Sequence, residues 1–330
     1  MNTAGVEYDA LLLVAFGGPE SIDDVALFLA RVTAGRPIPP ERLAEVADRY
    51  RSVGGRSPLN GRLRTLQAAV AAELVDRGTE VPVFWGNRNA APLLADTVAE
   101  MRDAGVRRAL AWVASPYSSY STCRQYAENI ETARTAVGPG APVIDRIGGH
   151  HDHPGLVQPA ADRLAEALDL LPADRRDRAH LLFSAHSIPS TMAATCDYVA
   201  QLHEVARLVA QRVDPDGRHD REVVWQSRSG PPQVPWLEPD VGDRIDTLAA
   251  AGVDAVVVSP IGFPVENFEI VWDLDVEAAG RAERAGVAFQ RAEAVDNDPR
   301  FINMIVDLFL EHDPDAGDTC RTDCCPPAPH

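Results

Sequence analysis

The sequence predicts an α/β protein of two lobes, each built from a parallel β-sheet flanked by helices, with a cleft between the lobes. Short apolar runs alternate with helical patterns along the chain, as they do in parallel sheets covered by helices. The two halves also resemble each other, because Leu11–Ser21 matches Leu181–Thr191 in its apolar run and in the position of a proline. This match suggests that one βα lobe was duplicated.

The expected elements divide between the two halves. Strands are expected at residues 10–16, 81–85, 109–115, 180–184, 222–225, 255–259 and 287–289. Helices are expected near residues 22–32, from 41, from 63, and near 93–104, 198–213, 241–251, 269–285 and 299–312. We place one lobe at residues 1–150, the second at 151–313 and a cysteine-rich tail at 314–330.

Composition and charge exclude several classes of protein. The 330 residues are 45% apolar and 24% charged, which is typical of a globular chain. The net charge of −18 argues against nucleic-acid binding, which needs a surplus of Lys and Arg. The apolar runs are far shorter than the roughly 20 residues of a membrane span, and the first nine residues do not resemble a signal peptide. We therefore expect a cytoplasmic protein without a transmembrane segment.

Chemistry-bearing side chains follow two of the expected strands. In open parallel sheets, ligands bind beyond the carboxyl ends of the strands. His186 comes directly after the strand that ends at Ser184, and its imidazole can bind a transition metal or take up a proton. Glu266 and Glu269 follow another strand, and their spacing places both carboxylates on one face of a helix start. Together, the imidazole and a carboxylate can hold a dication and move protons.

Two other patterns are weaker. The segment Gly17–Pro19 does not have the glycine spacing of a dinucleotide site. The segment His150–His153 contains three histidines and an aspartate, but adjacent side chains point apart, and we interpret it as a solvated loop.

The chain resembles the ferrochelatase family over nearly its whole length. The motifs that carry the resemblance are Leu12–Glu20, Gly54–Leu59, Tyr117–Ser121, Phe183–Pro189, Trp225–Gly230, Pro260–Phe263 and Trp272–Asp275. The run from Trp225 to Asp240 is similar to the actinobacterial branch of the family in particular. The resemblance implies two Rossmann-like, chelatase-type lobes and a lyase that inserts ferrous iron into coproporphyrin III. The product would be coproheme, in haem biosynthesis, and iron would be a substrate.

The resemblance also implies roles for individual residues. His186 matches the histidine that binds iron or accepts pyrrole protons, and Glu269 matches the glutamate that works with it. Phe16 stands where some relatives have a metal-binding tyrosine; a phenyl ring cannot ligate, so we expect it to pack on the macrocycle. The remaining expected substrate contacts are Arg49, Tyr50, Ser57 and Tyr126. One departure is Asn267, which replaces a histidine found in many relatives and leaves Glu266 as a rival to Glu269.

The cysteine tail predicts a metal centre. Cys320, Cys324 and Cys325 crowd a polar tail, and clustered thiolates bind soft metal centres. Actinobacterial relatives carry a 2Fe-2S cluster, which normally takes four cysteines. The fourth ligand would be Cys123 or Cys196, and we prefer Cys123.

Several alternatives stay open. The substrate could be protoporphyrin IX, or the metal could be cobalt or nickel inserted into a related tetrapyrrole. A two-lobed haem- or metal-binding protein without chemistry is a third alternative, although such proteins in bacteria usually carry an export signal. A downstream enzyme of haem biosynthesis is the expected partner for the product.

Overall fold

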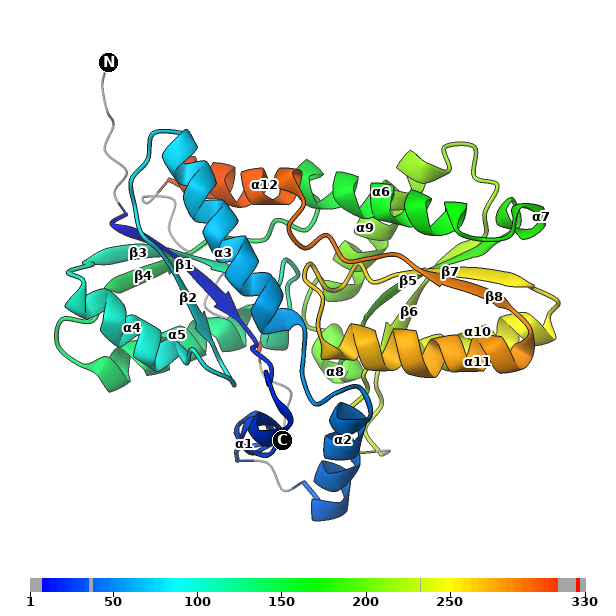
Figure 1. Ribbon diagram of the computed structural model, residues 1–330, viewed down its shortest axis with the longest axis horizontal. Helices are drawn as coiled ribbons and strands as arrows, with labels where there is room; N and C mark the ends of the chain where they lie inside the picture. The colour runs from blue at the N-terminus through cyan, green and yellow to red at the C-terminus, as the bar shows by residue number, and fades with distance from the viewer. Residues whose placement is uncertain (1–7, 36–37, 232, 314–324, 327–330) are drawn as a thin grey trace. The chain divides into compact units, whose positions relative to one another are not determined.

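The computed structural model describes residues 8–35, 38–231, 233–313 and 325–326 (Figure 1). The described chain forms two compact units. The first contains residues 8–114, 125–148 and 305–313, and the second contains residues 115–124, 149–304 and 325–326. The chain therefore leaves and re-enters each unit, and the domain limits drawn from the sequence stay predictions.

The first unit contains a four-stranded parallel sheet in the order β2-β1-β3-β4. The strands are β1 (Ala10–Ala15), β2 (Val83–Asn87), β3 (Arg108–Val113) and β4 (Val143–Arg146). All six residues of β1 are buried, because this strand lies between β2 and β3 and is covered on both faces. The fully apolar sequence of β1 is what a central parallel strand requires.

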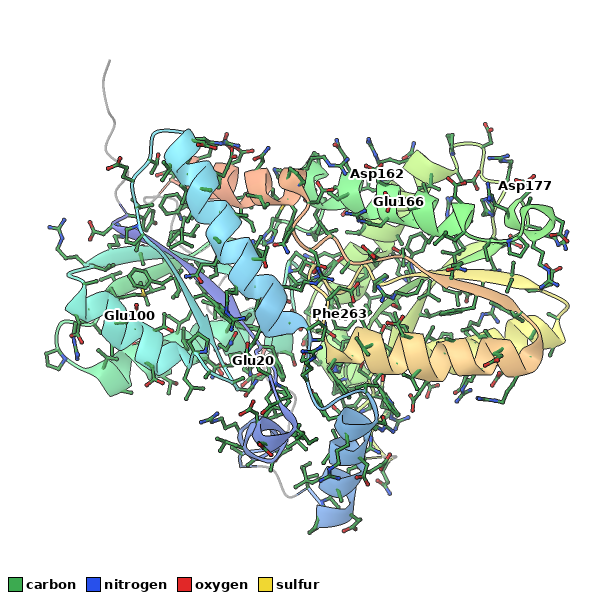
Figure 2. All side chains as sticks on the ribbon, viewed as in Figure 1. Glu20, Glu100, Asp162, Glu166, Asp177 and Phe263 are labelled. Carbon is green, nitrogen blue, oxygen red and sulfur yellow. The ribbon has the colours of Figure 1, made fainter. Side chains whose placement is uncertain are left out.

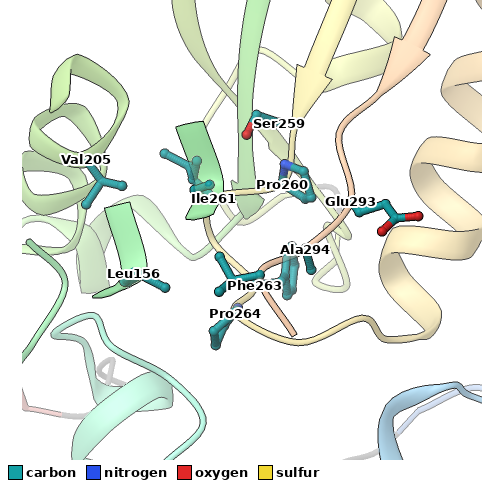
Figure 3. Close-up of a pocket in the computed structure, with 11 residues that line it drawn as sticks. Leu156, Val205, Ser259, Pro260, Ile261, Phe263, Pro264, Glu293 and Ala294 are labelled. Carbon is teal, nitrogen blue, oxygen red and sulfur yellow. The ribbon is translucent and has the colours of Figure 1, made fainter. Parts of the chain in front are cut away.

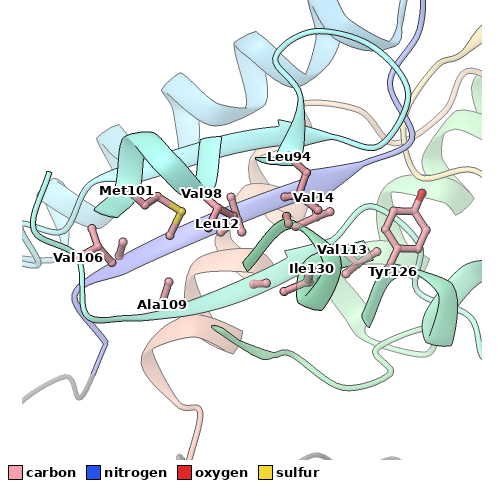
Figure 4. Close-up of a cluster of buried hydrophobic side chains, with 13 residues drawn as sticks. Leu12, Val14, Leu94, Val98, Met101, Val106, Ala109, Val113, Tyr126 and Ile130 are labelled. Atoms are coloured by element: carbon pink, nitrogen blue, oxygen red, sulfur yellow. The ribbon is translucent and has the colours of Figure 1, made fainter. Parts of the chain in front are cut away.

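Helices cover both faces of this sheet. On one face, α4 (Leu94–Asp103) and α5 (Gln125–Val137) pack on Leu12 and Val14 of β1 (Figure 4). On the other face, α3 (Leu59–Asp76) packs along β2 (Figure 1). Its buried apolar side chains are four leucines, with Leu59 at the start of the helix, and Val70. The short η1 (Ile22–Asp24), α1 (Val25–Val32) and α2 (Pro40–Ser52) lie between β1 and α3 in the chain.

The second unit repeats the arrangement with the strand order β6-β5-β7-β8. Its strands are β5 (His180–His186), β6 (Arg221–Gln226), β7 (Ala255–Ser259) and β8 (Ala288–Arg291). The helices on one face include α6 (Pro154–Asp169) and α9 (Tyr198–Val213), and those on the other are α10 (Val241–Ala250), η3 (Ile270–Ala278) and α11 (Ala279–Ala285) (Figure 1). The remaining helical segments are η2 (Tyr120–Arg124), α7 (Ala173–Arg176), α8 (Ser190–Ala193) and α12 (Pro299–Leu310). Equal strand order in both sheets agrees with the duplication suggested by the sequence.

The predicted fold class, two parallel sheets flanked by helices, is confirmed, but several elements differ. Strand β5 continues to His186, so this histidine is the last residue of the strand and does not follow it. The sequence missed β4, α5 and α6; β4 is short and partly exposed, and so lacks the apolar run of an inner strand. The helix expected at 269–285 begins with nine π-helical residues, for which the sequence gives no periodic signal.

Charged side chains cover the outer faces of the helices. Figure 2 shows Glu100 on α4 and Asp162 and Glu166 on α6, all of them exposed. Such side chains account for the strongly acidic balance without entering the cores. Among the described residues, no helix is both long enough and apolar enough to cross a membrane.

Candidate active site

His186 and Glu269 lie side by side in the second unit. The Nε2 atom of His186 is 3.4 Å from Oε1 of Glu269, and about a third of each side chain is exposed. His186 ends β5, the strand between β6 and β7, and Glu269 directly precedes η3. The structure thus brings together the two residues that the sequence analysis placed at strand ends, at the edge of the sheet where ligands bind.

The imidazole of His186 is held from two sides. Its Nδ1 donates a hydrogen bond to the backbone carbonyl of Ser187, which leaves Nε2 facing Glu269. Tyr198, from α9, donates from its hydroxyl to the carbonyl oxygen of His186 at 3.0 Å. The Tyr198 ring is buried and packs on Trp225 and Tyr117, with centroid separations of 6.0 and 5.9 Å. These contacts fix the end of β5 beneath the imidazole.

The charge of Glu269 sets the protonation of His186. Burial lowers the pKa of His186, but the negative charge and hydrogen bond of Glu269 outweigh it, and the pKa rises to about 9. At neutral pH the pair therefore consists of an imidazolium and a carboxylate. Such a pair can exchange a proton with a ligand, and it can bind a dication once the imidazole has lost its proton.

Asn267 and Glu266 have structural roles beside Glu269. The side-chain oxygen of Asn267 accepts hydrogen bonds from the backbone N–H groups of Glu269 (2.8 Å) and Ile270 (3.1 Å), so Asn267 caps the helical segment that carries Glu269. Glu266 is buried and pairs with Arg291 at 2.5 Å, and it also accepts from the backbone of Ala294. Glu266 is thus held by Arg291, and it is Glu269 that meets the imidazole.

Asp273 is a further acidic group of the site that the sequence analysis did not select. It lies four residues after Glu269, and its pKa is raised to about 7. Burial is the main cause, and the negative charge of Glu269 raises the pKa further, whereas a hydrogen bond from the hydroxyl of Ser227 lowers it. Ser227 has a positive φ of 61°, which is uncommon for a residue with a side chain. Gln226 links the two acidic residues, because its amide donates to the Glu269 carbonyl at 3.1 Å and to Asp273 at 3.4 Å. The family motif Trp272–Asp275, which contains Asp273, was the feature of the sequence that could have indicated this residue.

The five expected substrate contacts lie in the first unit. Phe16 follows β1 directly, and its ring, 38% exposed, packs edge-on against Phe28, which in turn packs against Tyr50. Arg49 forms a surface pair with Glu45 at 2.9 Å. A partly exposed pair of this kind contributes about 0 to 1 kcal/mol.

Ser57 is buried against the turn that follows Phe16. A Cβ atom on Gly18 would lie 2.5 Å from Cβ of Ser57, and one on Gly17 would lie 2.7 Å from Cβ of Asn87. Gly17 also has a positive φ of 79°. The two glycines are therefore required for the turn to pass between Ser57 and Asn87, and the turn fixes where Phe16 stands.

Tyr126 lies on α5 at one end of the buried cluster, beside Val14 and Val113 (Figure 4). The guanidinium of Arg88 stacks on the ring of Tyr126, 4.6 Å from the ring centroid. The same guanidinium lies 5.5 Å from the ring centroid of Phe16. Arg88, which directly follows β2, was not among the expected site residues. Its position directly after a strand was the feature of the sequence that could have indicated Arg88 as a site residue.

The cysteines are only partly described. Cys320 and Cys324 lie outside the described residues, whereas Cys325 is buried and has a positive φ of 49°. Cys123, half-buried in η2, belongs to the same unit as Cys325. The thiol of Cys196 donates to the carbonyl of Met192 at 3.3 Å. Within the described ranges no group of three or more metal-binding side chains occurs.

Residues 150–153 form a loop, as expected, but only part of this loop is exposed to solvent. His150 is buried, His151 pairs with Glu204 at 3.3 Å, and His153 accepts from the backbone of Gly155 as the cap of α6. The expected exposure is therefore wrong for His150, and the loop leads directly into α6, which the sequence analysis missed.

A small apolar pocket lies behind β7 in the second unit. Figure 3 shows the side chains of Leu156, Val205, Ile261 and Phe263 around it, with Glu293 at its edge. Its lining contains neither His186 nor Glu269, and it has one acidic side chain and no basic one. The pocket is therefore separate from the candidate active site.

The chain is similar to known proteins both in sequence and in fold. A sequence model described as ferrochelatase matches residues 8–313. The chain belongs to the ferrochelatase family. Among its relatives, coproporphyrin III ferrochelatase of Nocardia farcinica is 47% identical over 343 aligned positions, which cover 97% of each chain. Coproporphyrin III ferrochelatase of Mycolicibacterium smegmatis is 48% identical, with 93% of this chain and 90% of the relative covered. The predicted resemblance to the actinobacterial branch and the enzyme class, a metal chelatase, are confirmed.

Solved structures support the fold. The sirohydrochlorin chelatase of Bacillus subtilis subspecies spizizenii in complex with cobalt has a TM-score of 0.51 at 11% identity, over 92% of this chain and 94% of the other. A Bacillus subtilis chain with bound Fe3+ has a TM-score of 0.54 at 9% identity, with the same coverage. At such low identity the likeness concerns the fold, and it confirms the chelatase-type architecture.

Proposed function

We propose that this member of the ferrochelatase family inserts ferrous iron into coproporphyrin III and releases coproheme. The observation that carries the proposal is the pair formed by His186 and Glu269, 3.4 Å apart at the carboxyl end of a central strand. The names of the relatives, which match along nearly the whole chain, support the choice of porphyrin.

The reaction exchanges two pyrrole protons for one Fe2+ ion. An imidazole and a carboxylate suit both halves of this exchange, because they accept protons and bind a borderline dication. Since the pKa of His186 is about 9, the imidazole carries a proton at neutral pH and must release it before it accepts one from a pyrrole. Glu269 is the negative partner that first receives a proton or the metal.

Asp273 is the next proton acceptor beyond this pair. Its pKa of about 7 allows it to be protonated or charged near neutral pH, and Gln226 joins it to the backbone of Glu269. Ser227 and Gln226 hold the carboxyl group in place. We assign Asp273 the role of taking protons from the His186–Glu269 pair and passing them to water.

In the first unit, Phe16 offers its exposed ring to the flat face of the macrocycle. The porphyrin carboxylates would be bound by Arg49, Tyr50, Ser57 and Tyr126, as the family resemblance implies. Coproporphyrin has four propionates, which gives such groups more to bind than protoporphyrin IX does. An insertion assay with Fe2+ and both porphyrins side by side tests this choice: faster turnover of protoporphyrin IX in detergent-free buffer would contradict it.

The same assay separates the alternatives. Imidazole and carboxylate ligands do not by themselves select iron over cobalt or nickel. Faster insertion of Co2+ or Ni2+ than of Fe2+ would move the chain to another chelatase activity. Binding of porphyrin and metal without any insertion would instead make it a binding protein.

We also propose that the cysteine tail holds a 2Fe-2S cluster. The described part of the donor set fits: Cys325 is buried in an unusual left-handed conformation, and Cys123 lies in the same unit. Cys320 and Cys324 would supply the remaining thiolates. We keep Cys123 as the expected fourth ligand, with Cys196 as the alternative. Such a cluster supplies redox sensitivity and a covalent tie, neither of which metal insertion requires.

Colour and stability test the cluster. Anaerobically purified protein should absorb between about 300 and 600 nm, as thiolate-bound iron does. Cys320→Ser should remove the colour and lower the melting temperature, whereas the control Cys196→Ser should keep both. A colourless protein after anaerobic reconstitution with iron and sulfide would contradict the cluster, and loss of colour in Cys196→Ser alone would move the fourth ligand there.

The cytoplasmic location and transfer of coproheme to a later enzyme of haem biosynthesis stay predictions from the sequence. Coproheme keeps its four propionates, so an enzyme that converts it to haem must modify some of them. Transfer is tested by adding such an enzyme and following loss of coproheme from this protein by absorbance.

A further inference from the structure

Arg88 is a cation held between two aromatic rings. Its guanidinium carbon lies 4.6 Å from the ring centroid of Tyr126 and 5.5 Å from that of Phe16. The backbone N–H of Arg88 donates to the carbonyl of Ala15 at 3.0 Å, which ties the residue to the end of β1. Stacking on two rings fixes the plane of the guanidinium and so limits the directions in which its N–H groups point.

Among the residues that the structure describes, this guanidinium has no counter-charge. Within the described residues, the side chain of Arg88 forms neither an ion pair nor a hydrogen bond, and its Nε atom is buried without a partner. Two other arginines of the first unit that stack on rings are paired: Arg64, over Trp85, binds Glu20 at 2.7 Å, and Arg108, over Tyr8, binds Asp145 at 2.8 Å. In a chain of net charge −18, a partly buried arginine without a carboxylate is unusual and invites an anion from outside.

The place of Arg88 in the fold points to the same conclusion. Arg88 directly follows β2 and Phe16 directly follows β1, and these two strands are neighbours in the parallel sheet. Their carboxyl ends form the edge where ligands bind in open α/β sheets. The ring of Phe16 is 38% exposed at this edge, so a planar ligand on Phe16 would lie within reach of the guanidinium.

We propose that Arg88 binds one carboxylate of the tetrapyrrole while Tyr126 and Phe16 hold its plane. The inference rests on the proposed function and adds Arg88 to the substrate contacts as a residue that selects for carboxylate. The two Nη groups of the guanidinium would donate hydrogen bonds to the two oxygens of the carboxylate, because Nε is buried. Tyr126, an expected propionate contact, then acts chiefly as the platform for Arg88.

Equilibrium binding tests the proposal with two probes. Metal-free coproporphyrin III and its tetramethyl ester are titrated, in the same detergent, into the full chain, Arg88→Met and Arg88→Gln. We expect both variants to bind the acid about 10- to 100-fold more weakly, the loss of one hydrogen-bonded charge pair, and to bind the ester within about twofold of the parent. Arg64→Met is the matched control, since it also removes a cation from a ring, and it should bind both probes like the parent.

The outcomes separate this inference from the proposed function. Equal affinity of Arg88→Met, Arg88→Gln and the parent for the acid would overturn the role of Arg88, even if the parent metallates coproporphyrin normally. Equal weakening for acid and ester would also overturn it, because it would show that Arg88 only supports the aromatic platform. A parent that binds the acid without inserting iron would contradict the proposed function and leave the binding result for Arg88 intact.

Discussion

The carboxylate of Glu269 lies 3.4 Å from the imidazole of His186 and keeps that imidazole protonated up to a pH of about 9. The site thus stores a proton at neutral pH beside a negative charge. When a porphyrin delivers its pyrrole protons, the imidazole of His186 already carries a proton and cannot accept another. This relationship makes the order of proton release a measurable property of the enzyme.

Removal of the imidazole should stop insertion without removing the substrate. We expect His186→Ala to lower kcat for Fe2+ insertion by at least about 100-fold, the usual contribution of a positioned acid or base. Binding of coproporphyrin III should change by less than about threefold, and circular dichroism should show an intact fold. An active His186→Ala protein would contradict the mechanism.

The pH profile should follow the pair. If His186 must lose its proton before it accepts another, kcat/KM should rise with pH, with a midpoint near pH 9, and level off above it. Glu269→Gln removes the charge that raises the pKa of His186, so the midpoint of any residual activity should move to lower pH. A profile that falls between pH 7 and 9 in the parent would exclude this order of events.

The same shift affects stability with a defined sign. A histidine whose pKa is higher in the folded than in the unfolded protein adds stability that is complete below about pH 6.5 and is lost as the pH rises through about 9. The difference in melting temperature between the parent and His186→Ala should therefore shrink between pH 6.5 and 9. A difference that grows over this range would contradict the assigned shift.

Substitution of Glu266 should mainly affect stability, whereas substitution of Glu269 should mainly affect activity. Glu266→Gln weakens the buried pair with Arg291 and should lower the free energy of unfolding by about 1.5 to 3 kcal/mol, with activity reduced only mildly. Glu269→Gln should lower kcat severely. It also removes the charge that stabilises the imidazolium of His186, so its cost in stability at neutral pH should shrink as the pH rises toward 9. Urea denaturation and the insertion assay on both variants check this, and the reverse pattern would make Glu266 the catalytic carboxylate.

Asn267 should matter as a cap. Asn267→Ala removes the acceptor for the N–H groups of Glu269 and Ile270 and should cost about 1 kcal/mol of stability, whereas Asn267→Asp keeps the acceptor and should cost less. If Asn267 acted instead on the metal, the two variants would differ in the KM for Fe2+ rather than in melting temperature.

The sequence predicted what depends on local patterns. Apolar runs located seven of the eight strands that the described ranges contain, and strand ends pointed to His186 and Glu269, because the topology of parallel sheets gathers those ends at one edge. Strand β4 escaped because its residues are half-exposed. Phe16 and the other expected substrate contacts came from the family resemblance, because no periodic pattern in the sequence indicates them.

The contacts that depend on tertiary packing could not be predicted. Nothing near Glu266 in the sequence marks Arg291, 25 residues later, as its partner, so the choice between Glu266 and Glu269 stayed open. Arg88 meets Tyr126 only after β2 and α5 have packed on the sheet. Asp273 gains its high pKa from burial, which the spacing of acidic residues does not reveal.

The repeated strand order has an evolutionary consequence. Phe16 and His186 stand at matching places, one just past the end of β1 and the other at the end of β5, the strands that are equivalent in the two sheets. The duplication suggested by the sequence would give this position two copies, each free to specialise. One copy now presents an inert ring and the other a titratable one, so mutations that tune porphyrin fit at Phe16 can accumulate without touching the proton chemistry at His186.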